Sequence, residues 1–234
     1  MKLDLIISAD DIKKEKILGK TVVVIDMLRA TSVIITAIDN GCRKVIPVLT
    51  INEALELSKV NRESFVLGGE RNAIKIEGFD CSNSPIEFTK EALKDKTLIM
   101  STTNGTRAIN GSIGAKHILL GAIINAKAVA KKIIELGEDV VIVNAGTYGQ
   151  FSMDDFICGG YIIHSILDEI NVELSDICKT ANYIYNNNKD IMSFLKLASH
   201  YNTLEKLGLL DDLEYCCKKD IINVVPEYRD GVIK

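Results

Sequence analysis

Short apolar segments rich in β-branched residues alternate with helical patterns through the first two thirds of the chain. Two of these segments, residues 22–25 and 140–143, are apolar at every position, which is typical of strands covered on both faces. This alternation predicts an α/β fold with a layered α/β/α arrangement and a mixed, partly parallel sheet. The predicted strands are residues 3–7, 22–25, 45–48, 65–67, 98–100, 118–120 and 140–143.

Capping residues mark where several of the intervening helices begin and end. Thr50 and Glu53 have the spacing of a capping box, in which the threonine hydroxyl accepts a hydrogen bond from the third helical residue. Ser84 before Pro85 predicts another helix start, because proline is favoured at the first helical position. Gly137 follows the pattern "AKAVAKKIIEL" and predicts a helix that ends in a left-handed glycine.

The last third of the chain is rich in helical patterns. A long helix is expected after Ser152, and shorter ones near residues 176–185, 190–198 and 211–219. An apolar piece at 223–225 is expected to rejoin a sheet before "RDG" forms a surface turn. No linker-like stretch interrupts the chain, so we treat residues 1–234 as a single α/β domain. A two-lobed organisation divided near residue 120 is left open.

Composition and charge exclude several classes of protein. The chain is 47% hydrophobic and 26% charged, so it can bury a sizeable core, and its net charge of −4 provides no basic stripe for nucleic acid. No apolar run approaches the roughly 18 residues of a membrane span, and the first residues lack the apolar region of a signal peptide. We therefore expect a cytoplasmic protein that binds neither nucleic acid nor membrane. The six cysteines show no C-x-x-C pair and are interpreted as buried apolar residues.

The placement of arginine is more informative than the total charge. Only six of the 28 basic residues are arginine, and three of them, Arg29, Arg71 and Arg107, lie in loops rich in Gly, Thr and Asn. A guanidinium group recognises carboxylate or phosphate oxygens through a planar pair of donors, which lysine cannot offer. The pattern indicates a ligand that carries oxyanions.

Polar residues also gather directly after predicted strands. Asp26 ends an entirely apolar strand and is followed by Arg29 and Thr31, and Glu70 and Arg71 follow a later strand. Ligands of open α/β sheets bind outside the carboxyl ends of the strands, so we expect these loops to meet at one site. Each motif also has a purely structural interpretation, because an aspartate there can form an Asx turn and an acid–base pair can be a surface salt bridge.

The stretch "TTNGTR" at residues 102–107 permits two interpretations. Asn-Gly between extended segments is a strong signal for a hairpin turn, with the glycine at positive φ. The surrounding hydroxyls and the arginine instead favour a cradle in which backbone amides, Thr103, Thr106 and Arg107 bind an anion. We favour the cradle.

Asp26 and Glu70 are the carboxylates best placed beside the loops to hold a metal, with Asp154 as a third candidate, and the histidines are scattered. Asp154 lies in the first turn of the helix after Ser152, where the helix dipole alone also favours a carboxylate. His117, His164 and His200 are each interpreted as structural. No phosphate-binding P-loop and no dinucleotide fingerprint is present.

Taken together, six segments resemble the 2-phosphosulfolactate phosphatases of coenzyme M biosynthesis. The resemblance implies a magnesium-dependent acid phosphatase that converts 2-phosphosulfolactate to sulfolactate and phosphate, with an α/β architecture particular to the family. The match is less close in "SHYNTLEKLG", where members tend to have glycine and arginine after the histidine. The matching segments are "VVVIDMLRATSVIITAIDNG", "LGGERN", "GFDCSNSPIEFT", "STTNGTRAI", "NAGTYGQFSMDD" and "DLEYCCKKD" with "VVPEYRDG".

Combining the motifs with the resemblance, we assign expected roles to the residues. Catalytic roles are expected for Asp26, Arg29, Glu70 and Arg71, and Mg²⁺ ligands are expected at Asp26, Glu70 and Asp154. Substrate contacts are expected from Thr31, Asn83, Ser84, Thr102, Thr103, Asn104, Gly105, Thr106 and Arg107.

Alternatives stay open at this point. The same loops suit a catalytically silent module that binds phosphate or organic acids, or an isomerase or lyase that anchors a phosphate. Asp26 suits either a metal ligand or a covalent nucleophile. The expected partner is a small, anionic, phosphorylated substrate, and assembly into a homo-oligomer is left open.

Overall fold

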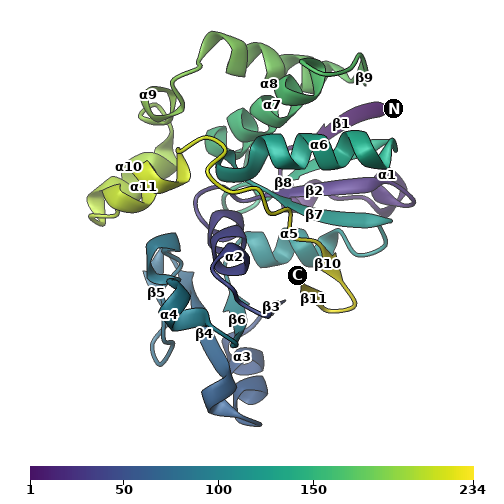
Figure 1. The fold of residues 1–234 in the computed structure, drawn as a ribbon. Helices are drawn as coiled ribbons and strands as arrows, with labels where there is room; N and C mark the ends of the chain where they lie inside the picture. Colours follow the sequence, from purple (N-terminus) through teal and green to yellow (C-terminus); the bar gives the residue numbers. More distant parts are fainter.

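The computed structural model describes residues 1–234 and contains two β-sheets with helices packed around them (Figure 1). Sheet A has five strands in the order β7-β2-β8-β1-β9, and all its pairs are parallel. The strands are β1 (Lys2–Ile6), β2 (Thr21–Ile25), β7 (His117–Gly121), β8 (Val140–Asn144) and β9 (Glu173–Leu174).

Sheet B has six strands in the order β10-β11-β3-β6-β4-β5 and is mixed. Its central strands β3, β6 and β4 are parallel, whereas β5 and the C-terminal hairpin β10–β11 pair antiparallel at its edges. The predicted α/β class is therefore confirmed, with two sheets where the sequence suggested one. The strands are β3 (Lys44–Pro47), β4 (Phe65–Arg71), β5 (Ile74–Lys75), β6 (Thr97–Ser101), β10 (Tyr228–Arg229) and β11 (Val232–Ile233).

The two sheets interleave along the chain. The chain forms β1 and β2 of sheet A, builds most of sheet B, and returns to sheet A with β7 and β8. The suggested division near residue 120 falls inside β7 (His117–Gly121). The last strand, β11, pairs Ile233 with Val45 of β3, so the end of the chain rejoins sheet B, while residues 223–225 form no strand.

Helices flank both sheets. In Figure 1, α6, α7 and α8 lie above sheet A and α5 lies below it, while α2 lies between the two sheets. The first eight residues of α2 are buried because this helix carries no charge before its last residue. None of the helices combines the length and the apolar composition required to span a membrane. The helices of sheet A are α1 (Lys14–Ile17), α2 (Ala30–Asp39), α5 (Gly105–Gly111), α6 (Ala126–Leu136), α7 (Met153–Leu167) and α8 (Asp176–Asn187).

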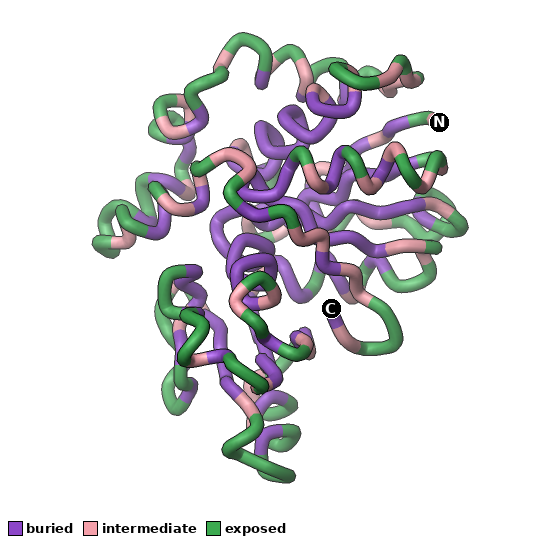
Figure 2. Tube along the Cα trace, viewed as in Figure 1, coloured by how far each residue is buried: buried purple, intermediate pink, exposed green.

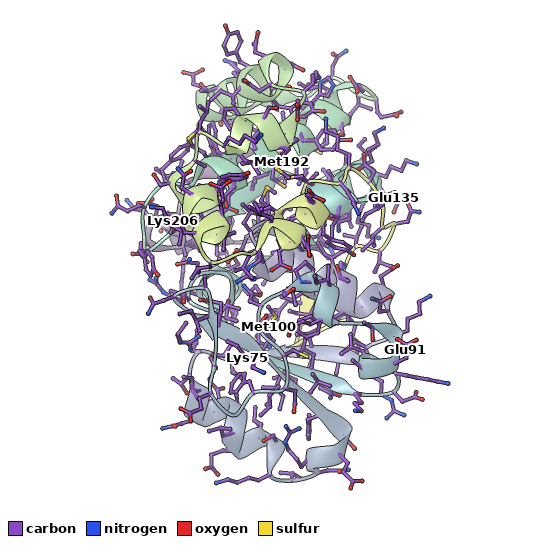
Figure 3. All side chains as sticks on the ribbon, turned by 90° about the vertical axis from the view of Figure 1, so that its left-hand side faces the viewer. Lys75, Glu91, Met100, Glu135, Met192 and Lys206 are labelled. Carbon is purple, nitrogen blue, oxygen red and sulfur yellow. The ribbon has the colours of Figure 1, made fainter.

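The remaining helices are short. Viewed from the side (Figure 3), Met192 and Lys206 of the C-terminal helices lie in the upper half of the molecule, and Met100 and Lys75 of sheet B lie in the lower half. Helix α10 was not predicted, since residues 199–206 were expected to lie between helices. These helices are α3 (Ile51–Ser58), α4 (Lys90–Leu93), α9 (Ile191–Leu195), α10 (Ser199–Lys206) and α11 (Leu210–Cys216).

The core follows the apolar strands. Every residue of β2 and β8 is buried, as the uninterrupted apolar patterns predicted, and Figure 2 shows the buried positions concentrated along sheet A. One cluster of 59 buried residues joins sheet A to the surrounding helices, whereas six residues form a separate small core under α3.

Two predicted caps are confirmed, and the helix starts predicted at Ser84 and Ser152 are found without a capping hydrogen bond from the serine side chain. The Thr50 hydroxyl accepts from the Glu53 N–H at 3.1 Å, and Gly137 ends α6 with φ of 66°. Ser84 and Ser152 precede helical turns but cap neither of them, because their hydroxyls bond to carboxylates instead. Both carboxylates belong to the site described next.

Candidate active site

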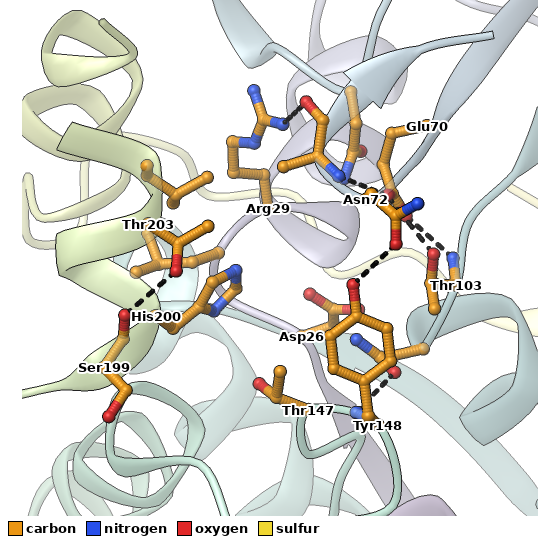
Figure 4. A pocket seen from close by; sticks show the side chains of 15 residues that line it. Asp26, Arg29, Glu70, Asn72, Thr103, Thr147, Tyr148, Ser199, His200 and Thr203 are labelled. Atoms are coloured by element: carbon orange, nitrogen blue, oxygen red, sulfur yellow. Dashed lines mark hydrogen bonds between the residues drawn. The ribbon is translucent and has the colours of Figure 1, made fainter. Parts of the chain in front are cut away.

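A cavity of about 220 Å³ opens where strands of both sheets end (Figure 4). The loops after β2 and β8 of sheet A approach it from one side, and those after β4 and β6 of sheet B from the other, while α10 closes the third side. It is lined by Asp26, Leu28, Arg29, Glu70, Asn72, Ala73, Asn83, Thr103, Asn104, Thr147, Tyr148, Ser199, His200, Thr203 and Leu204.

Asp26 follows the last residue of β2 and is almost completely buried. Its Oδ1 accepts from the Ala30 N–H at 3.3 Å, and its own N–H donates to the Thr31 hydroxyl at 3.1 Å. Thr31, predicted to contact substrate, therefore fixes the Asp26 backbone instead. Burial, reinforced by the negative charge of Glu70, raises the pKa of Asp26 to about 6, although the charge of His200 opposes this.

Arg29 is the one predicted arginine that lines the cavity. Its side chain is 1% exposed, and its Nη1 lies 2.5 Å from Oδ2 of Asp212 while Nη2 donates to the Ala73 carbonyl at 3.1 Å. The Ser84 hydroxyl donates to the other oxygen of Asp212 at 2.5 Å. Asp212, in α11, was not predicted, and it fixes the guanidinium so that the remaining donors of Arg29 keep one orientation.

The other two predicted arginines point elsewhere. Arg71 donates to the Glu70 carbonyl at 2.7 Å and to the Ser101 hydroxyl at 2.8 Å, and Arg107 forms a partly exposed ion pair with Asp10. Neither guanidinium lines the cavity. A catalytic role for Arg71 and a substrate contact for Arg107 are thus not supported by their positions.

Glu70 organises the loops of sheet B. Its carboxylate accepts from the Thr103 N–H at 2.7 Å, from the Thr103 hydroxyl at 3.2 Å and from the Ala73 N–H at 2.9 Å. Both oxygens are therefore occupied within the protein. Glu70 lines the cavity, as predicted, and its hydrogen bonds link the end of β4 to the end of β6.

The stretch at residues 102–107 is neither a hairpin nor a complete cradle. It carries the chain from β6 into α5, and Gly105 does not have the positive φ expected of a turn. Thr103 and Asn104 line the cavity. Thr102 and Thr106 lie behind it and bond to each other, the Thr106 N–H donating to the Thr102 hydroxyl at 3.1 Å.

Gly105 allows the two sheets to meet. A Cβ at this position would lie 2.6 Å from the Cβ of Ala30 and 2.8 Å from Oδ2 of Asp26. Both distances are too short for real contacts, so only glycine permits α5 to start directly beside α2. Gly105 thus leaves room for the Asp26 carboxylate and does not itself line the cavity.

Asn83 is buried, and its Oδ1 has no hydrogen-bond partner in the protein although the residue lines the cavity. Buried polar groups are normally paired, so an unpaired amide beside a cavity indicates a position for a ligand or water. The substrate contact expected of Asn83 stays a prediction.

His200, interpreted as structural from the sequence, lies on the cavity wall. Its Nδ1 lies 3.1 Å from Oδ2 of Asp154, whose other oxygen accepts from the Ser152 hydroxyl. Burial disfavours the charged imidazole, but the hydrogen bond and charge of Asp154 outweigh it and raise the pKa of His200. Burial would also raise the pKa of Asp154, yet His200 lowers it. Residues 154 and 200 are far apart in sequence, so no local pattern could have indicated the pair.

Asp154 is accordingly reassigned. It was predicted as a metal ligand, but it does not line the cavity, and both of its oxygens are held by Ser152 and His200. The structure contains no group of three or more His, Cys, Asp or Glu side chains arranged to hold a metal ion. Of the three predicted ligands, only Asp26 presents an oxygen, Oδ2, without a hydrogen bond from the protein.

Tyr148 extends across the mouth of the cavity (Figure 4). Its hydroxyl donates to Oδ1 of Asn72 at 3.0 Å, and its N–H donates to Oδ1 of Asn104 at 3.1 Å. Tyr148 follows β8 of sheet A, whereas Asn72 and Asn104 follow strands of sheet B. The tyrosine therefore connects the two halves at the entrance.

The charge of the site is negative without a further cation. Two carboxylates, Asp26 and Glu70, line the cavity together with two basic groups, Arg29 and His200. Each basic group is also paired with a carboxylate behind the cavity wall, Asp212 or Asp154. A phosphate dianion would meet net repulsion here. One small divalent cation coordinated by Asp26 and by ligand oxygens would offset that charge, and Mg²⁺ commonly uses one or two carboxylates together with phosphate oxygens.

Comparison with known proteins gives a consistent result. Residues 6–231 match the family model described as 2-phosphosulpholactate phosphatase. A protein of Clostridium kluyveri named probable 2-phosphosulfolactate phosphatase is 66% identical over 234 residues, covering 100% of this chain and 98% of that protein. Proteins with the same name from Clostridium novyi and Clostridium tetani are each 62% identical, covering 98% and 100% of this chain and 97% and 100% of their own lengths.

Proposed function

We propose that this chain, which belongs to the 2-phosphosulpholactate phosphatase family, hydrolyses the phosphate monoester of 2-phosphosulfolactate or of a closely related anionic phospho-acid. The products would be sulfolactate and phosphate. The observation that carries the proposal is the cavity itself, in which a buried, fixed arginine and a histidine paired with a carboxylate lie beside the largely buried Asp26. Its volume of about 220 Å³ suits a substrate of this small size.

Phosphate-monoester hydrolysis sets three requirements. The enzyme must neutralise the equatorial oxygens, position a nucleophile and stabilise the leaving alkoxide. Arg29 meets the first requirement, because Asp212 and the Ala73 carbonyl hold its guanidinium and leave its remaining N–H donors for an anion. Asn83 and Thr103 supply neutral polar groups to the same cavity.

Asp26 meets the second requirement. It is fixed by Ala30 and Thr31 at the end of β2, and its Oδ2 makes no hydrogen bond within the protein. In that position the carboxylate can orient a water toward phosphorus or attack phosphorus itself. Glu70 contributes indirectly by holding Thr103 and Ala73 in place.

Magnesium is part of the proposal, and Asp26 is the residue best placed to hold it. Glu70 and Asp154 are less suitable than the sequence suggested, because both oxygens of each are engaged within the protein. When bound, the ion would supply the positive charge that the cavity lacks and neutralise phosphate oxygens. The two basic groups of the lining are each paired with a carboxylate behind them, so the carboxylates of Asp26 and Glu70 are left without a cation of their own, which supports this part of the proposal.

The test is a measurement of phosphate release by the purified chain after exhaustive chelation, with and without added Mg²⁺. The substrates are 2-phosphosulfolactate and phosphorylated three-carbon acids without the sulfonate. We expect release that requires Mg²⁺ and is fastest with the sulfonated substrate. Release that survives chelation would contradict the magnesium part alone. No release from any substrate would favour a binding module, an isomerase or a lyase.

A further inference from the structure

His200 is oriented toward the cavity by a buried carboxylate behind it. Figure 4 shows its ring on α10, on the side of the cavity opposite the loops of sheet B. Nδ1 is engaged with Asp154 at 3.1 Å, while Nε2 makes no hydrogen bond within the protein. The side chain is 19% exposed, so it reaches the cavity while most of its surface is covered.

This arrangement fixes both the tautomer and the charge of the imidazole. A carboxylate at Nδ1 holds the proton there and stabilises the imidazolium that forms when Nε2 is also protonated. Asp154 is itself held by Ser152, so the whole array is rigid. The other charged groups near the ring are Asp26, which favours the imidazolium, and Arg29, which opposes it.

The leaving group of the proposed substrate needs a proton donor, and a histidine in this position can be that donor. The proposed substrate is the phosphate ester of an aliphatic alcohol, and its alkoxide is a strong base that leaves poorly without a proton. Arg29 stays protonated, and Asp26 serves the attacking oxygen in the proposed function, so neither of them is the donor. His200 also lines the cavity, and its ring nitrogen Nε2 makes no hydrogen bond within the protein, so this nitrogen can carry the proton.

We propose that His200, oriented by Asp154, is the catalytic acid that protonates the leaving oxygen of the substrate. As the P–O bond breaks, its electron pair passes to the departing oxygen, which takes the proton from Nε2 of His200 and leaves as the free alcohol. Water supplies the oxygen that ends on phosphorus, and a proton of that water restores His200. This inference rests on the proposed phosphatase function and adds a residue to it.

The test compares esters that differ in how much their leaving groups need a proton. His200→Asn removes the acid, and kcat/KM is measured for 2-phosphosulfolactate and for 4-nitrophenyl phosphate, whose phenolate leaves readily. We expect a loss of about 10²- to 10⁴-fold for the alkyl ester and of less than about tenfold for the aryl ester. His164→Asn, on α7 and outside the cavity lining, is the matched control and should change neither value.

A second variant keeps the comparison usable if His200→Asn does not fold. Asp154→Asn leaves the imidazole in place but removes the charge behind it, so it should also slow the alkyl ester more than the aryl ester. Equal losses for both esters in the folded variants would overturn the inference and leave His200 a structural role. Absence of phosphate release by the wild-type protein from either ester would overturn the proposed function and, with it, this inference.

Discussion

Two loops of similar sequence have different roles in this protein. Both follow a buried strand and lead into a helix through a Thr/Arg/Ala pattern, one as "VVVIDMLRATS" after β2 and the other as "TLIMSTTNGTR" after β6. Arg29 of the first loop is buried against Asp212 in the cavity wall, whereas Arg107 of the second forms a partly exposed ion pair with Asp10.

The difference comes from where each arginine stands relative to its helix. Arg29 is the N-cap of α2, so it still belongs to the loop at the carboxyl end of the strand. Arg107 is already the third residue of α5, and its side chain leaves the helix on the outer side. A displacement of a few positions along a similar motif therefore separates a buried arginine in the cavity wall from a surface arginine.

The arginines offer the most direct test of this comparison and the largest expected effect. Arg29→Lys keeps the charge but loses the planar pair of donors, so kcat/KM should fall at least tenfold, or about 1.4 kcal/mol. Arg107→Lys should change it by less than about twofold, since an exposed ion pair contributes little. Both are measured by phosphate release at matched folded concentration. Similar losses at both positions would mean that Arg29 and Arg107 do not differ in their importance for turnover.

Gly105 tests the contact between the loops. Gly105→Ala would push a methyl group against Ala30 and Asp26, and overpacking of this kind costs about 1–3 kcal/mol of unfolding free energy. We also expect several-fold slower turnover in the folded fraction, because Asp26 must shift. Thermal melting and kcat/KM report the two effects.

The control for Gly105 lies in the same helix. A Cβ at Gly111 would meet only the flexible end of Ile12, at 2.9 Å, so Gly111→Ala should be tolerated with turnover unchanged. If Gly105→Ala has the same melting temperature and the same kcat/KM as Gly111→Ala, the close approach of α5 to α2 does not position Asp26.

Tyr148 tests the connection across the cavity mouth and should give a smaller effect. Tyr148→Phe removes the hydrogen bond to Asn72 but keeps the ring. The loss of one partly exposed bond corresponds to about 0.5–1.5 kcal/mol. We expect this loss to appear mainly as a higher KM, with a smaller change in kcat. A fall in kcat at unchanged KM would instead place the hydroxyl in the chemical step.

The smallest expected effect is on stability as a function of pH in the metal-free protein. The pKa of His200 is raised above its ordinary 6.5, so its contribution is complete below that pH and is lost as pH rises through the folded-state pKa. The pKa of Asp154 is lowered from 3.8, so its contribution is present above that pH and is lost as pH falls through the folded-state pKa. Their pairing should therefore stabilise the fold most in mildly acidic solution.

The measurement is the difference in unfolding free energy between wild type and His200→Asn across this range. It should be larger at about pH 5.5 than at about pH 9, by on the order of 1 kcal/mol. The charge of His200 also lowers the pKa of Asp26, so the difference reports on His200 together with both carboxylates. A difference that is independent of pH would show that the ion pair does not form in solution.

Local sequence determined the elements of this protein well. Uninterrupted apolar runs fixed β2 and β8 as buried strands, and Thr50 and Gly137 marked real helix ends. These features could be predicted because periodicity and capping depend on residues only a few positions apart. Part of the site was also foreseeable, because Glu70 and Thr103 follow neighbouring parallel strands, and the loops at the carboxyl ends of such strands meet at one edge. Asp26 and Arg29 follow a strand of the other sheet, so only the tertiary structure brought the two pairs to one cavity.

Only the tertiary structure decided how those residues are paired. Asp212 reaches Arg29 across 183 positions, and His200 reaches Asp154 across 46, so neither pair has a signature in any short stretch. The division into two interleaved sheets likewise depends on which strands pair, and several registers would satisfy the same apolar pattern. A charged side chain buried by long-range packing requires a partner, and the fold, not the motif, determines which carboxylate supplies it.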